Sequence, residues 1–98
     1  MLIRIVKMIF APQETESFLE LFDRNKEKIR GFEGCDHLEL YRDKNEQNTF
    51  FTYSYWRDED ALENYRHSPL FKEVWQETKS KFAGKPEAWS VDRLEKLD

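Results

Sequence analysis

The segment from Phe50 to Phe71 brings several chemically useful side chains close together in the chain. Trp56 stands at the end of an aromatic run, and Tyr65, His67 and Phe71 follow within one helical stretch. An indole offers a flat surface on which a planar ligand can stack. Tyr65 can donate a hydrogen bond, and His67 has the reference pKa closest to neutrality. The segment therefore predicts a ligand pocket beside Trp56.

Each of these residues also has a purely structural interpretation. Trp56 can pack as core between a sheet and the helices that cover it, and the two interpretations of this residue are evenly matched. A buried tyrosine hydroxyl such as that of Tyr65 usually finds a partner for structural reasons alone. His67 precedes Ser68 and Pro69, where a helix is expected to break, so it can equally be a capping or rim residue.

Hydrophobic periodicity defines the elements that must position these side chains. Alternating and β-branched residues predict four strands, at residues 2–10, 35–42, 49–56 and 86–92. Helical spacing predicts a helix that begins at Gln13 or Thr15 and ends at Gly31. A second helical segment is capped by Asp58, breaks at Ser68-Pro69 and restarts, continuing to Gly84.

The order strand, helix, strand, strand, broken helix, strand predicts an α+β fold. It is the ferredoxin-like βαββαβ plan, with a four-stranded antiparallel sheet and helices on one face. The 98 residues form a single domain, 1–98, with a charged tail from about residue 93. Strict alternation along residues 35–42 places Cys35, His37, Glu39 and Tyr41 on one face.

The third strand predicts how the chain assembles. Because side chains alternate along a strand, Phe51, Tyr53 and Tyr55 fall on the sheet face that no helix covers. Three aromatic rings make a larger apolar patch than a monomer usually leaves exposed to water. We therefore expect a homodimer joined through this sheet face.

Charge and composition limit the other partners. The formal net charge is −4 and the chain has no run of basic residues, which argues against nucleic acid and anionic membranes as partners. Cys35 is the only cysteine, so no internal disulfide can form. The apolar N-terminal stretch is interrupted by Arg4 and Lys7, unlike a signal peptide or a membrane span. We expect a cytoplasmic protein.

Four short features occur in an order that resembles one known family. They are Phe10-Ala11-Pro12, the turn Phe32–Cys35, Trp56 before the helix start Asp58–Leu62, and Ser68-x-x-Phe71. Their order and spacing resemble the antibiotic biosynthesis monooxygenase family of dimeric α+β-barrel proteins, over about residues 1–92.

The resemblance implies a cofactor-independent monooxygenase that acts on a small hydroxylated aromatic molecule, such as a quinol or an anthrone. A deprotonated phenol can itself reduce O₂, so no metal or flavin is required. The resemblance implies that substrate is bound by Trp56, Thr52, Phe71 and Trp75, while His67 or Tyr65 handles a proton. The alternative is a non-catalytic dimeric module that binds a small molecule in the same pocket.

Two positions argue against the haem-degrading branch of this family. Those relatives carry an Asn on the first strand, where this chain has Val6, and a His four residues past Phe71, where it has Trp75. Indole cannot ligate iron, so we do not expect haem as a cofactor. Tyr65 also stands where many relatives carry a histidine, and tyrosine is a poor base at neutral pH.

Overall fold

The computed structural model describes all 98 residues. Its elements are β1 Leu2–Ile9, α1 Thr15–Arg30, β2 Cys35–Arg42, β3 Thr49–Trp56, α2 Glu59–Arg66, α3 Pro69–Lys79 and β4 Glu87–Asp92, with a 3₁₀ turn at Pro12–Glu14. This order confirms the predicted ferredoxin-like α+β fold. No helix is long and apolar enough to cross a lipid bilayer.

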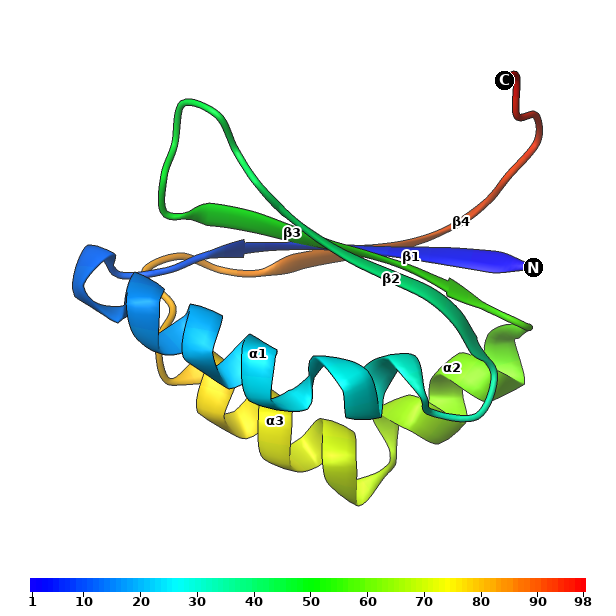
Figure 1. The fold of residues 1–98 in the computed structure, drawn as a ribbon, viewed down its shortest axis with the longest axis horizontal. Coiled ribbons are helices and arrows are strands. Elements are labelled where there is room, and N and C mark those ends of the chain that lie inside the picture. Colours follow the sequence, from blue (N-terminus) through cyan, green and yellow to red (C-terminus); the bar gives the residue numbers. More distant parts are fainter.

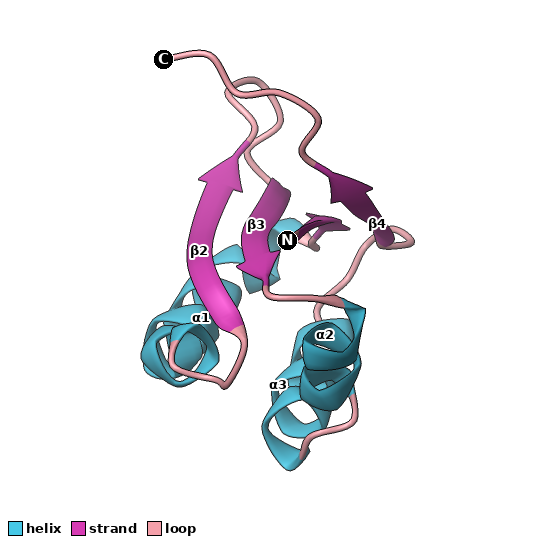
Figure 2. Cartoon of the chain, turned by 90° about the vertical axis from the view of Figure 1, so that its right-hand side faces the viewer, coloured by secondary structure: helices cyan, strands magenta, loops and turns pink.

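The four strands form one antiparallel sheet in the order β2-β3-β1-β4. All three helices lie on the same side of this sheet (Figure 1). Seen from the end, α1 lies on the β2 side, while α2 and α3 lie toward β4 (Figure 2). We call the uncovered side of the sheet the open face. The sheet therefore has one side that can enclose a ligand and one that is available for association.

Two side-chain caps produce the predicted break between α2 and α3. The Asp58 carboxylate accepts a hydrogen bond from the backbone N–H of Ala61 at 2.8 Å. The Ser68 hydroxyl accepts one from the N–H of Phe71 at 3.1 Å, and Pro69 is the first helical residue. The break allows residues on either side of it to meet, and the rings of Tyr65 and Phe71 lie 5.1 Å apart.

The end of α3 differs from the prediction. The helix ends at Lys79 rather than continuing to Gly84. After it, Phe82 forms an isolated β-bridge with Phe10, and the two rings lie 5.3 Å apart. Burying Phe82 against Phe10 requires the chain to leave the helical path, so tertiary contacts override the helical spacing here.

A β-bulge at the start of β2 corrects the predicted placement of Cys35. Cys35 is opposite Trp56 and His37 is opposite Tyr55, so one extra residue, Asp36, interrupts the alternation. The bulge turns Cys35 toward the helices, where it is buried in the core. Only the later residues His37, Glu39 and Tyr41 share the open face.

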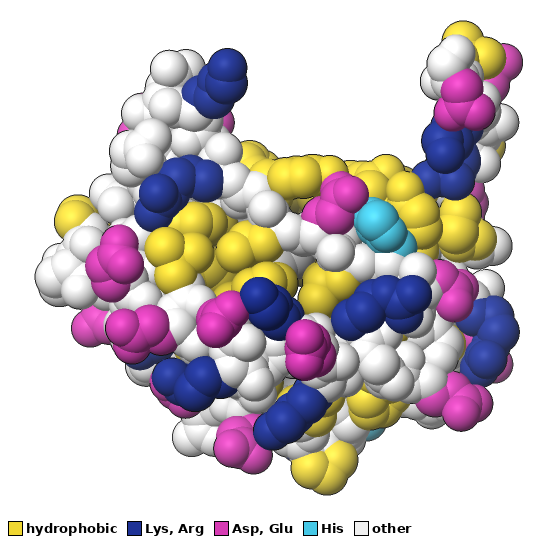
Figure 3. All heavy atoms as spheres, in the orientation of Figure 1, with side chains coloured by type: hydrophobic (Ala, Val, Ile, Leu, Met, Phe, Trp, Pro, Cys, Tyr) yellow, Lys and Arg dark blue, Asp and Glu magenta, His cyan; other side chains and the backbone are white.

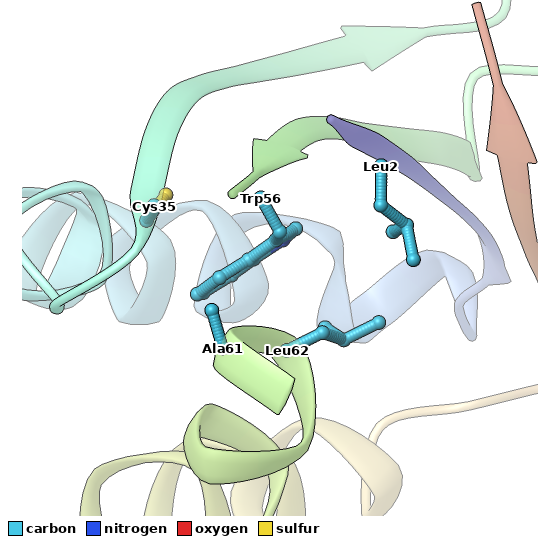
Figure 4. Close-up of a cluster of buried hydrophobic side chains, with 5 residues drawn as sticks. All are labelled: Leu2, Cys35, Trp56, Ala61 and Leu62. Carbon is cyan, nitrogen blue, oxygen red and sulfur yellow. The ribbon is translucent and has the colours of Figure 1, made fainter. Parts of the chain in front are cut away.

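The core consists of two clusters at opposite ends of the helix-covered face. The first contains Leu2, Cys35, Trp56, Ala61 and Leu62; in Figure 4 the Trp56 side chain lies between Cys35 and the two α2 residues. The second contains Met8, Phe10, Phe18 and Phe50. Because the two clusters lie at opposite ends of β1 and β3, the middle of the sheet is left for smaller side chains.

Candidate functional site

A cavity of about 470 Å³ lies between the sheet and the helices. Its floor is the middle of β1 and β3, where Val6 is opposite Thr52 and Arg4 is opposite Ser54. The larger pairs Leu2–Trp56 and Met8–Phe50 stand at the two ends. Large side chains at the ends, with the small Val6, Thr52 and Ser54 between them, leave a hollow of the size typical of small-molecule sites, about 300–1,000 Å³.

The cavity lining is mainly hydrophobic, at 13 of 20 residues. The side chains contributed by the helices and their neighbours include Phe18, Phe22, Ile29, Leu62, Tyr65, Phe71, Val74 and Trp75. Such a lining favours an apolar, flat ligand, because transfer of its apolar surface out of water is favourable.

Trp56 is both a core residue and a wall of this cavity. Its side chain is only 1% exposed and belongs to the first core cluster. The indole Nε1–H donates to the Ser54 hydroxyl at 3.0 Å, and the ring stacks on Tyr65 at 4.9 Å with an interplanar angle of 25°. The two interpretations of Trp56 are therefore compatible, since its environment fixes the ring at the edge of the hollow.

Tyr65 presents its ring to the cavity from α2. Burial, and secondly the nearby Cys35 thiol, raise the pKa of the Tyr65 hydroxyl. A raised pKa keeps the hydroxyl protonated at neutral pH. Tyr65 is thus suited to donate a hydrogen bond to a ligand and unsuited to accept its proton.

The other predicted binding residues also meet at the cavity. Thr52 lines its floor, and Phe71 and Trp75 line the α3 side. The rings of Phe71 and Trp75 are nearly parallel, 5.8 Å apart with an interplanar angle of 12°. Together with Trp56 and Tyr65, these residues give the hollow two stacked aromatic pairs.

His67 is the one predicted site residue that the structure does not bring to the cavity. It follows the last turn of α2 and its side chain is 74% exposed. Its ring Nδ1 lies 2.8 Å from the backbone oxygen of Glu63, so the side chain folds back on its own helix. The imidazole is held by this helix end, and a role inside the cavity would require it to leave that position.

Comparison with known proteins places this architecture in a family. Residues 1–77 match the family model described as antibiotic biosynthesis monooxygenase. The chain belongs to the antibiotic biosynthesis monooxygenase family. Among curated proteins, it is 32% identical over 62 residues to an uncharacterized protein of Synechocystis sp.; the match covers 63% of this chain and 42% of that relative's length.

Several solved structures share this fold. A crystal structure titled antibiotic biosynthesis monooxygenase superposes with a TM-score of 0.90 at 20% identity, covering 97% of this chain and 100% of that chain. A putative member from Deinococcus radiodurans gives 0.89 at 13% identity, covering 100% and 97%. One from Caulobacter crescentus gives 0.88 at 21%, covering 96% and 90%. At these identities the likeness shows a shared fold.

In this member of the antibiotic biosynthesis monooxygenase family, sequence reasoning missed four polar lining residues: Arg4, Ser54, Arg66 and Glu87. Arg4 and Ser54 could have been found from the alternation, because they share a period of two with Leu2, Val6 and Trp56. Arg66 and Glu87 stand at the ends of elements, where a pattern does not predict side-chain direction.

The positions used to argue against haem also belong to the cavity of this family member. Val6 and Trp75 both line it, so an isopropyl group and an indole stand there. An indole offers no lone pair in the ring plane for a metal. No group of three or more His, Cys, Asp or Glu side chains gathers anywhere in the 98 residues.

Proposed function

We propose that this protein is a cofactor-independent monooxygenase acting on a small hydroxylated aromatic molecule of the quinol or anthrone type. The observation that carries the proposal is the apolar cavity of about 470 Å³ with the stacked Trp56–Tyr65 pair as one wall. Membership of the antibiotic biosynthesis monooxygenase family supports the reaction class.

The proposed reaction needs orientation and a dry environment more than it needs a metal. The ring stacks beside Trp56, and the Tyr65 hydroxyl donates a hydrogen bond to the substrate oxygen. The ionised substrate passes an electron to O₂, and the resulting pair combines to a peroxide at the ring carbon. The peroxide takes up a proton from solvent, and loss of water then converts the C–H carbon into C=O, so one oxygen atom enters the product and the other leaves as water.

The substrate hydroxyl proton leaves toward water at the edge of the cavity. Glu87 is opposite Lys7, and alternation with the cavity residues Val6 and Ala88 places both on the open face, so water itself accepts the proton. In this scheme His67 is not required.

The test is O₂ consumption with a panel of naphthols, quinols and anthrones. We expect uptake above autoxidation, one O₂ per product, with one labelled oxygen in the quinone when ¹⁸O₂ is used. Trp56→Ala should lower kcat/KM by at least about tenfold, and Tyr65→Phe by about tenfold, because one donor to the developing charge is lost. Tyr53→Phe, which removes a hydroxyl from the open face of the same sheet, is the matched control. Uptake equal to the protein-free background, or equal in all variants, would refute the proposal.

A second candidate function is binding without turnover. No histidine lines the cavity, and the raised pKa of Tyr65 removes it as a base, which favours a module that holds an aromatic molecule unchanged. Thermal-shift measurements with the same panel discriminate between the two. Ligands that raise the melting temperature and are recovered intact after aerobic incubation would favour binding over oxygenation.

A further inference from the structure

Two guanidinium groups border the same cavity from different elements. Arg4 comes from β1 and Arg66 is the last residue of α2. In Figure 2, α2 lies beneath the part of the sheet that carries β4, the neighbour of β1, so the two elements border the cavity from the same side. Cationic side chains are costly beside an apolar cavity unless an anion compensates them.

Arg4 has no anionic partner in the protein. Its Nη1 donates to the Ser90 hydroxyl at 3.0 Å, and no carboxylate lies within ion-pair distance of 4.0 Å. A guanidinium carries five N–H donors, so most of the donors of Arg4 are not used by other side chains. Partial burial, then the charge of Arg66, lower the pKa of Arg4, while the charge of Glu63 acts in the opposite direction.

Arg66 has a partner that a ligand can displace. Its Nη1 lies 2.9 Å from a Glu63 carboxylate oxygen, one turn earlier on α2. The two side chains are 44% and 49% exposed, and ion pairs between such exposed groups contribute little to stability. An anion that enters the cavity can therefore bind Arg66 in place of Glu63 with little loss of stability.

The negative charge of Glu87 lies away from the Arg4 side chain. Arg4 is opposite Ser90 in the β1–β4 register, whereas Glu87 is opposite Lys7. Three residues along a strand correspond to roughly 10 Å and reverse the face of the sheet, so the Glu87 side chain is well removed from that of Arg4. The cavity is thus electrostatically asymmetric, with the cationic pair in one region.

We infer that the ligand of this cavity is an aromatic molecule carrying a carboxylate, which Arg4 and Arg66 bind while the ring lies beside Trp56. A planar guanidinium matches a carboxylate in two parallel hydrogen bonds. This inference deepens the proposed function and rests on it for the hydroxylated aromatic ring. The carboxylate and its binding pair are the new elements.

The test compares 1-hydroxy-2-naphthoate with its methyl ester, two ligands that share a ring and differ in charge. Binding is measured by titration calorimetry without oxygen, so that no turnover occurs. We expect the wild-type protein to bind the acid at least about tenfold more tightly than the ester. Arg4→Gln and Arg66→Gln should each weaken binding of the acid at least about fivefold and leave the ester within about twofold. Arg57→Gln removes a guanidinium that does not line the cavity and should change neither affinity.

Equal affinity for acid and ester in the wild-type protein would overturn the inference, and so would an unchanged preference in both cavity variants. Arg66 is exposed at a helix end, so its variant provides a result even if Arg4→Gln unfolds the protein. If the acid binds tightly and no panel member causes O₂ consumption, the monooxygenase proposal is refuted and the anion site is supported. Turnover of neutral quinols with no preference for the acid would overturn the anion site alone.

Discussion

Trp56 has a fixed orientation because three different contacts hold its indole. The core cluster surrounds it, Tyr65 stacks on it and the Ser54 hydroxyl accepts its N–H at 3.0 Å. A ring held on all these sides needs no reorganisation when a ligand arrives. Fixed walls of this kind reduce the entropy lost on binding.

The hydrogen bond between Trp56 and Ser54 gives a prediction at the scale of single residues. Ser54→Ala leaves the buried indole N–H without an acceptor and should lower the free energy of unfolding by about 1–2 kcal/mol. In the Trp56→Phe background the same substitution should cost close to nothing, because no N–H is stranded. Urea denaturation of the four proteins measures the difference. A similar cost in both backgrounds would show that Ser54 acts through something other than this bond.

Individual site residues could be predicted from sequence only where a pattern fixed their direction. Trp56, Thr52 and Phe71 follow from strand alternation and from the helix restart after Ser68, and all three line the cavity. His67 lies next to the same restart, but its ring does not point into the cavity. Its Nδ1 lies against the Glu63 carbonyl at the end of α2. A one-residue change in position at a helix end rotates a side chain by about 100°, which spacing alone does not resolve.

At the scale of elements, Gly34 determines how closely α2 approaches the start of β2. Its φ is +89°, a conformation that side chains rarely adopt. A Cβ at this position would lie 2.5 Å from the Cβ of Ala61 in α2. The Gly34 carbonyl also accepts the N–H of Arg57 at 2.8 Å. The glycine therefore permits the contact that seats α2 and its Tyr65 beside Trp56.

Gly34→Ala should destabilise the protein by about 2–4 kcal/mol, from backbone strain together with the overlap with Ala61. Gly84→Ala is the control, because its nearest contact would be an ordinary 3.4 Å from the end of the Ile9 side chain. In the double variant Gly34→Ala/Ala61→Gly the overlap disappears, so the loss should be smaller than the sum of the two single losses. Thermal or urea unfolding measures all four variants. Additive losses would mean that the contact with α2 is unimportant.

The elements themselves were predictable because local signals and tertiary contacts agree at most of them. Asp58, Ser68 and Pro69 form the caps that their sequence pattern indicates. The prediction failed at the end of α3 and at the start of β2. Phe82 leaves the helical path to bury its ring against Phe10, and Asp36 adds a residue that strict alternation does not anticipate. Both errors arise from long-range contacts that a single segment does not contain.

The whole molecule has one covered and one open side. The open face exposes Tyr41 at 46%, Trp89 at 43% and Val91 at 39% of their surfaces. The β2–β3 connection and the C-terminal tail both project from this side (Figure 1). In the space-filling view, hydrophobic side chains gather between these two projections (Figure 3). The open face is thus an apolar surface with a projecting segment at each end, and a second copy of the same sheet can pack between these segments.

We propose that two chains associate through their open faces, burying at least the roughly 1,600 Å² of a standard interface. Sedimentation equilibrium at micromolar concentration should give a mass near twice the 12.0 kDa of the chain. Trp89→Glu places a charge on the open face, where its desolvation would oppose association, and should shift the protein toward monomer. Gln76→Glu adds the same charge on the exposed side of α3 and should leave the dimer intact. A monomeric wild-type protein, or equal dissociation of both variants, would exclude the open face as the interface. If the dimer forms as expected, the helix-covered cavity of each chain stays clear of the interface and should bind its ligand with the same affinity in both variants.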